Sequence, residues 1–143
     1  MREILFRGKT NYEGIDSEWL YGSLLAESQN TFPIIARDYD NDEDWIGVNG
    51  WGTVDPETVG QFTGLTDKNG EKIFEGDIVR FREWSNGDMC WVGKVHYEHQ
   101  QFVVSGDKNK ECETPFTLVM SRFIPENIEV IGNIHDNPKL LNN

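Results

Sequence analysis

The chain has 143 residues, of which 37% are hydrophobic and 27% are charged, a balance typical of one soluble globular core with at most a small appended subdomain. Its formal net charge of −12 argues against nonspecific binding to a nucleic-acid backbone, which needs a local excess of Lys and Arg. No stretch approaches the roughly 18 apolar residues of a membrane span, and the first residues lack a signal-peptide pattern, so we expect a cytoplasmic protein.

The N-terminal part of the chain consists of short apolar runs separated by polar turns. Strands are predicted over residues 4–8, 19–25 and 32–37. Gly22 lies inside the second run and fits a strand with a bulge or bend better than a helix. Residues 45–48 and 51–54 flank Asn49-Gly50, a pair that favours a hairpin turn, so a further hairpin is expected there.

Residues 38–44 are the most acidic segment, with Asp at every second position. This alternation resembles the first half of a calcium loop. An EF-hand loop that starts at Asp38 needs Gly at its sixth position and Glu at its twelfth, where this chain has Glu43 and Asn49. We interpret the segment as a solvated acidic loop, with a weak cation site as the alternative.

Residues 61–81, QFTGLTDKNGEKIFEGDIVRF, contain the densest strand and turn signals in the chain. Just before them, residues 55–59 carry an N-cap Asp followed by Pro and Glu, which predicts one short helical or 3-10 turn or a connection between strands. Asn69-Gly70 predicts a type I′ hairpin turn with Gly70 at positive φ. Asp77 follows Gly76 and is expected to accept a hydrogen bond from turn backbone.

Further strands are predicted after this stretch: an antiparallel meander over residues 78–81, 91–97 and 102–105, then strands over 116–120 and 128–134. A turn is expected over residues 98–101. Many short strands, abundant Gly and no long helix predict an all-β protein with little helix. The fold we expect is an SH3-like small β-barrel with additional N-terminal β-hairpins.

The acidic residues are unevenly distributed, which suggests a division of the chain. Residues 1–60 carry 4 basic and 12 acidic side chains, whereas residues 61–143 carry 9 and 13. We predict an acidic β-rich region over residues 1–60, an SH3-like barrel portion over 61–138 and a tail over 139–143. One continuous domain over residues 1–138 is the alternative.

Motifs in three regions of the chain carry a family resemblance. They are VDPETVGQFTGL at residues 54–65 with DKNG at 67–70 and IFEGDIV at 73–79, then IEVIGNIHDNP at 128–138, and LFRGK at 5–9. Together they resemble the YopX family of phage and prophage proteins over nearly the whole chain. The resemblance implies a β-rich fold with an SH3-like barrel portion, a phage or prophage origin, and no established activity or catalytic residue.

No chemical motif points to catalysis, since the nucleophile-elbow, Walker and H-E-x-x-H patterns are absent. His96 and His99 lie at a strand end and in the following turn, so we expect surface histidines, with a two-His metal site as the alternative. Cys90 and Cys112 lack C-x-x-C spacing, so we expect reduced thiols, with a disulfide or a metal role as the alternative. We therefore predict no catalytic residue, no cofactor and no metal.

One group of basic side chains is exceptional in so acidic a chain. Four of them would share the outer face of two neighbouring strands, with a tryptophan beside them. The group is Arg80, Arg82, Lys94 and His96, with Trp84. Such a patch suits a carboxylate-rich or phosphate-bearing partner. The alternative is a solvated face balanced by Glu83 and Glu98.

These observations favour a non-enzymatic phage or prophage accessory protein that binds a macromolecule, a protein rather than a nucleic acid, or that self-associates. A homo-oligomer is expected because small all-β domains leave strand edges to be covered. The alternative is a small hydrolase or nucleotide-handling enzyme with a site built from scattered carboxylates. A pocket that holds several ionisable groups within mutual hydrogen-bond reach would favour that alternative.

Overall fold

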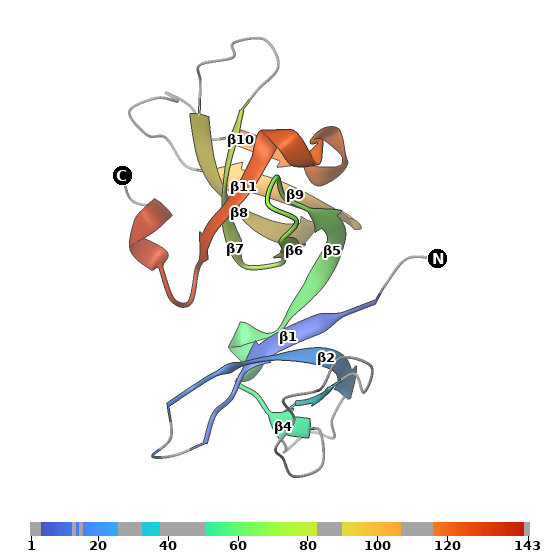
Figure 1. The fold of residues 1–143 in the computed structure, drawn as a ribbon, viewed down its shortest axis with the longest axis vertical. Coiled ribbons are helices and arrows are strands. Elements are labelled where there is room, and N and C mark those ends of the chain that lie inside the picture. The colour runs from blue at the N-terminus through green and yellow to red at the C-terminus, as the bar shows by residue number, and fades with distance from the viewer. Residues whose placement is uncertain are drawn as a thin grey trace. The chain divides into compact units, whose positions relative to one another are not determined.

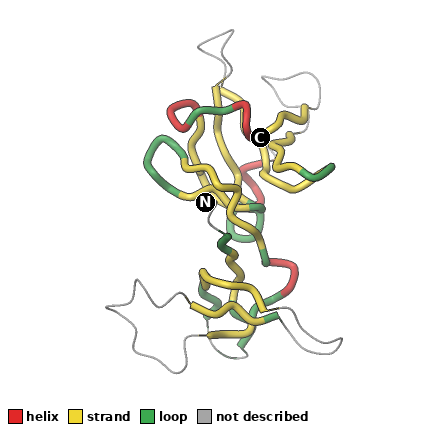
Figure 2. Tube along the Cα trace, turned by 90° about the vertical axis from the view of Figure 1, so that its right-hand side faces the viewer, coloured by secondary structure: helices red, strands yellow, loops and turns green. Residues whose placement is uncertain are grey.

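The computed structural model describes residues 4–12, 14, 16–25, 33–37, 51–82, 90–106 and 116–141, and these residues form an all-β structure. Figure 1 shows its strands, and Figure 2 shows that helix is limited to short turns. Over these ranges, no helix has the length and apolarity needed to cross a membrane. The chain divides into two compact units, residues 1–62 and 63–143.

The first sheet has six strands in the order β4-β3-β2-β1-β5-β6. The strands are β1 (Phe6–Lys9), β2 (Trp19–Leu25), β3 (Ile34–Arg37), β4 (Trp51–Thr53), β5 (Gly60–Thr66) and β6 (Lys72–Phe74). Gly22 pairs in regular register with Phe6 on one side and Arg37 on the other. The predicted strand is therefore confirmed, and of the predicted bulge or bend at Gly22 the bulge does not occur.

The core of the first unit forms where β2 and β3 turn alternate side chains inward. Leu20, Ile35 and Val54 are buried together, and Leu24 and Val59 pack against them. Tyr21 and Leu25 occupy the opposite face of β2 and are exposed, as the two-residue period of a strand requires.

The second sheet has five strands in the order β10-β9-β8-β7-β11. The strands are β7 (Asp77–Arg82), β8 (Cys90–Glu98), β9 (Gln101–Gly106), β10 (Phe116–Val119) and β11 (Ile128–Asn133). Strands β7, β8 and β9 form the predicted antiparallel meander, and β11 returns to pair antiparallel with β7. Over the described residues, neither sheet closes on itself.

Phe81 lies at the centre of the core of the second unit and is 1% exposed. Its ring centroid lies 5.9 Å from that of Trp91, 5.6 Å from that of Phe116 and 4.9 Å from that of Phe123. Tilted and edge-on rings at such separations add to the stabilisation that comes from burying their apolar area. Because Phe81 points inward, its neighbours Arg80 and Arg82 are directed to the other face of β7.

The turn between β5 and β6 differs from the predicted type I′ turn. Gly70 has a φ of 78°, as expected, but Asn69 is not among the residues with positive φ. The Gly70 N–H donates to Asp67 O at 3.0 Å, and the Asp67 N–H donates to Glu71 O at 2.8 Å. This is a three-residue loop with Gly in the left-handed position. The carboxylate of Asp67 favours it, because it accepts the N–H groups of Asn69 and Glu71.

A two-residue loop with positive φ at both positions does occur, between β8 and β9. His99 has a φ of 51° and Gln100 a φ of 67°, and Glu98 pairs with Gln101 across the loop. The turn over residues 98–101 is thus confirmed. Neither central residue is Gly, Asn or Asp, so strand pairing, rather than residue preference, determines this conformation.

Short 3-10 turns lie between these strands and after β11. η2 (Pro56–Thr58) shows that residues 55–59 contain a 3-10 turn, one of the alternatives predicted there, and the Glu57 N–H donates to Asp55 Oδ1 at 3.1 Å. η3 (Met120–Arg122) and η4 (Pro125–Asn127) lie between β10 and β11. η5 (Pro138–Leu141) contacts β8, and the predicted tail over residues 139–143 begins inside it.

Buried Asp77 behaves as the sequence predicted, because its Oδ2 accepts the Phe74 N–H at 2.8 Å. Other sequence predictions concern residues outside the described ranges. These are the acidic segment 38–44, the hairpin arm 45–48 with its Asn49-Gly50 turn, and any pairing of Cys90 with Cys112.

Replacing Gly70 by Val should lower the free energy of unfolding by roughly 1 kcal/mol or more, because a β-branched residue is strained at positive φ. No atom lies within 4 Å of the added Cβ, so a steric clash would not contribute. Gly70→Asn is the control, since Asn tolerates this conformation better. Urea unfolding measures both variants, and an unchanged Gly70→Val variant would contradict the turn geometry.

Candidate functional site

The turn between β5 and β6 is hydrogen-bonded to β11 by two adjacent residues. Asp67 is 2% exposed, and its Oδ2 accepts the Val130 N–H at 2.9 Å. The Lys68 N–H donates to Ile128 O at 3.0 Å. With the bonds from Asn69 and Glu71, the buried carboxylate accepts three backbone N–H groups, which offsets its loss of hydration. Lys68 is thereby held beside β11.

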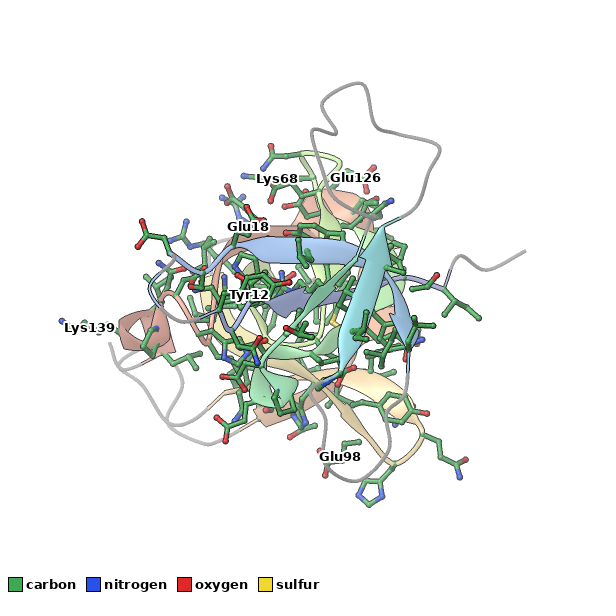
Figure 3. The ribbon with its side chains drawn as sticks, turned by 90° about the horizontal axis from the view of Figure 1, so that it is seen from below. Tyr12, Glu18, Lys68, Glu98, Glu126 and Lys139 are labelled. Atoms are coloured by element: carbon green, nitrogen blue, oxygen red, sulfur yellow. The ribbon has the colours of Figure 1, made fainter. Side chains whose placement is uncertain are left out.

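A groove of about 480 Å³ lies on the second unit, where β7, β11, η4 and this turn meet. Its charged lining consists of three cations and two carboxylates, namely Lys68, Arg80, Arg82, Glu126 and Glu129. Figure 3 labels Lys68 and Glu126. The lining thus has a net positive charge in a protein whose net charge is −12. We call it the basic groove.

Glu129 links two of the cations in the basic groove. It lies directly opposite Arg80 in the pairing of β11 with β7. Its Oε2 is 3.2 Å from Lys68 Nζ but 3.9 Å from Arg80 Nη1. The side chains of Lys68 and Arg80 are 47% and 50% exposed, and such exposed pairs contribute at most about 1 kcal/mol each. Much of the Arg80 guanidinium therefore remains accessible.

Arg82 is the second accessible arginine of the basic groove. It is exposed, and no carboxylate of the described residues lies within 4.0 Å of its guanidinium. Arg82 and Arg80 thus present two cationic groups on the same face of β7, and of the two only Arg80 has a described acid, Glu129, within 4.0 Å.

The strand registers bear directly on the predicted basic face. Arg80 lies opposite Val92 and Arg82 opposite Cys90, and Lys94 lies opposite Ile78. Because side chains alternate, Arg80, Arg82, Lys94 and His96 belong to one face of the sheet. Only the two arginines line the groove. Trp84 lies outside the described residues.

His96 is directed toward β9 and makes a local contact there. Its Nε2 is 2.8 Å from Ser105 Oγ and 3.9 Å from Glu98 Oε2, and Glu98 (labelled in Figure 3) also lies 3.4 Å from His99 Nε2. In a catalytic triad, one ring nitrogen of the His contacts the nucleophile and the other ring nitrogen is held by the acid. Here both partners approach Nε2, so this Ser-His-Glu group does not have triad geometry.

No group of three or more His, Cys, Asp or Glu within the described ranges is arranged to hold a metal ion. The sequence reasoning did not identify Lys68, Glu126 and Glu129 as groove residues. A local signal existed only for Lys68, which follows the turn-forming Asp67. Glu129 and Arg80 come together only through the long-range pairing of β11 with β7.

The fold and the groove define a small all-β protein that presents a mixed-charge surface groove. The chain belongs to the YopX family, since the family model described as YopX protein matches residues 6–142. The crystal structure of protein EF1440 from Enterococcus faecalis is similar, with 25% sequence identity over 99% of each chain and a TM-score of 0.59. A comparison with curated proteins gives no match.

Replacing Asp67 by Ala should lower the free energy of unfolding by roughly 3 kcal/mol or more, because three backbone N–H groups lose their acceptor. Asp55→Ala is the control, since Asp55 accepts one exposed N–H at η2. This substitution should lower the free energy of unfolding by about 1 kcal/mol. Urea unfolding of both variants measures the difference. Equal losses would show that Asp67 contributes no more than an ordinary capping residue.

Proposed function

We propose that this YopX-family protein is a non-enzymatic phage or prophage accessory protein that binds a protein partner through the basic groove. It would act in the cytoplasm of the bacterial host. The main observation in favour is the pair of exposed guanidinium groups of Arg80 and Arg82 beside Lys68 in a strongly acidic chain. Arginine recognises carboxylates through charge-assisted hydrogen bonds, which suits an acidic protein surface.

A protein partner agrees better with the charges than a nucleic acid does. A net charge of −12 repels a polyanion at long range, and a few local cations would have to overcome that repulsion. Glu126 and Glu129 also line the groove and would lie close to any phosphate bound there. A protein partner can place its carboxylates beside the arginines and its hydrogen-bond donors beside the two glutamates.

We also propose that residues 61–138 form an SH3-like barrel portion. The order β11-β7-β8-β9-β10 supports this, because a four-strand meander is followed by a last strand that pairs with the first. The 3-10 turns η3 and η4 precede that last strand, as a short helical turn does in SH3-like domains. Such domains bind many kinds of ligand, so the groove, and not the fold, carries the functional proposal.

Self-association is included in the proposal, because β4 and β10 are edge strands of their sheets and edges can pair with a second copy. Sedimentation equilibrium at micromolar concentration measures it. A single species of 16.5 kDa would remove self-association from the proposal.

Affinity capture from host cells, followed by mass spectrometry, tests the binding proposal. The Arg80→Glu/Arg82→Glu double variant should lose a partner that the wild-type protein retains, because both guanidinium groups become repulsive to carboxylates. The control is Lys94→Glu/Lys139→Glu, which changes the net charge equally outside the groove. This control should retain the partner.

Two results would contradict the proposal. One is a partner captured equally well by both double variants. The other is a DNA gel shift at physiological salt that disappears only in Arg80→Glu/Arg82→Glu, since the proposal predicts no measurable nonspecific DNA binding.

A further inference from the structure

The two groove arginines have a spacing that selects a ligand shape. Arg80 and Arg82 are separated only by Phe81, which is 1% exposed and points into the core. Since a strand rises about 3.4 Å per residue, their Cα atoms lie about 7 Å apart on one face. An extended peptide repeats its own same-face side chains at that interval. Carboxylates at alternate positions of such a peptide can therefore each face one arginine.

The two arginine positions are not equivalent in the free protein. At Arg82, no described carboxylate lies within 4.0 Å. At Arg80, the chain supplies its own acid, because Glu129 lies opposite in the strand register and is shared with Lys68. Glu129 thus occupies the place that a ligand carboxylate would take between these two cations. Its contacts are exposed, and the one to Arg80 is long, so a ligand carboxylate can replace it at little cost.

We propose that the basic groove binds an extended acidic segment of a protein partner, with carboxylates at two alternate positions, and that Glu129 competes with this segment for Lys68 and Arg80. This inference rests on the proposed function and specifies the ligand of the same groove. One ligand carboxylate is bound by Arg82. The next on the same face displaces Glu129 from Arg80, and Glu129 is the intramolecular competitor that weakens binding.

Two acidic peptides of equal composition test the spacing. One has the order Ser-Asp-Ser-Asp-Ser-Asp-Ser, and the other, the control peptide, has the order Ser-Asp-Asp-Ser-Ser-Asp-Ser, in which no two Asp residues lie two positions apart. Fluorescence anisotropy of labelled peptides at low ionic strength measures the dissociation constants. The alternating peptide should bind about threefold or more tightly than the control peptide, because only it places two carboxylates two positions apart on one face. Arg80→Glu/Arg82→Glu should abolish binding of both.

Two charge-matched variants test the competitor. Glu129→Gln and Glu126→Gln each remove one negative charge from the groove lining, but only Glu129 has Lys68 and Arg80 within 4.0 Å. Glu129→Gln should tighten binding of the alternating peptide about threefold more than Glu126→Gln does. An equal gain from both variants would overturn the competitor role, because removal of charge alone would explain it.

The remaining outcomes distinguish this inference from the proposed function. Equal binding of the two peptides, or tighter binding of a single-stranded oligonucleotide, would overturn the inference. Failure of both peptides would also overturn it, and if capture of a partner still depended on Arg80 and Arg82, the proposed function would stand. If that capture also failed, the proposed function itself would be wrong.

Discussion

The second unit and its groove depend on the hydrogen bonds that the buried carboxylate of Asp67 accepts. It accepts two N–H groups of its own turn and the N–H of Val130 on β11, so one side chain both shapes the loop and docks it. β11 is an edge strand of its sheet, and an edge presents backbone groups that must be satisfied or covered. The carboxylate and the Lys68 N–H meet two of these groups, at Val130 and Ile128. A local turn thereby completes a sheet edge that is distant in sequence.

The groove follows from this docking. With the turn held against β11, Lys68 is near enough to share Glu129 with Arg80, and the pairing of β11 with β7 fixes which residue faces Arg80. The outcome is a groove whose cations are partly neutralised by the protein's own acids. Such an arrangement favours selectivity over affinity, because a ligand must match the positions of the charges rather than their total. Under the proposed function, a strongly acidic protein would in this way recognise an acidic partner at one place on its surface.

The features that could be predicted from the sequence depend on neighbours along the chain. Strand periodicity placed Arg80 and Arg82 on one face of β7, because side chains alternate with a period of two residues. The Asp-Pro-Glu order indicated a short helical or 3-10 turn as one of two alternatives for the segment that forms η2. The turn at Asp67 was predicted with the wrong type, since residue preference at Asn69-Gly70 took no account of a carboxylate that binds both its own loop and β11. His99-Gln100 adopts positive φ without the Gly, Asn or Asp that such a loop usually contains, because the pairing of β8 with β9 imposes it. The contact of Lys68 with Glu129 could not be predicted from the sequence, since it depends on strand order, which local patterns do not determine.

Native-state amide hydrogen exchange at Val130 tests the role of Asp67 most directly. The Val130 N–H donates to the Asp67 carboxylate, which is 2% exposed. If this bond holds the turn on the sheet edge, the Val130 amide should exchange as slowly as amides of the inner strand β7, because opening it requires the docked turn to leave. Exchange at the rate of an unprotected edge amide would show that the turn is not held against β11, and that the groove is not preformed.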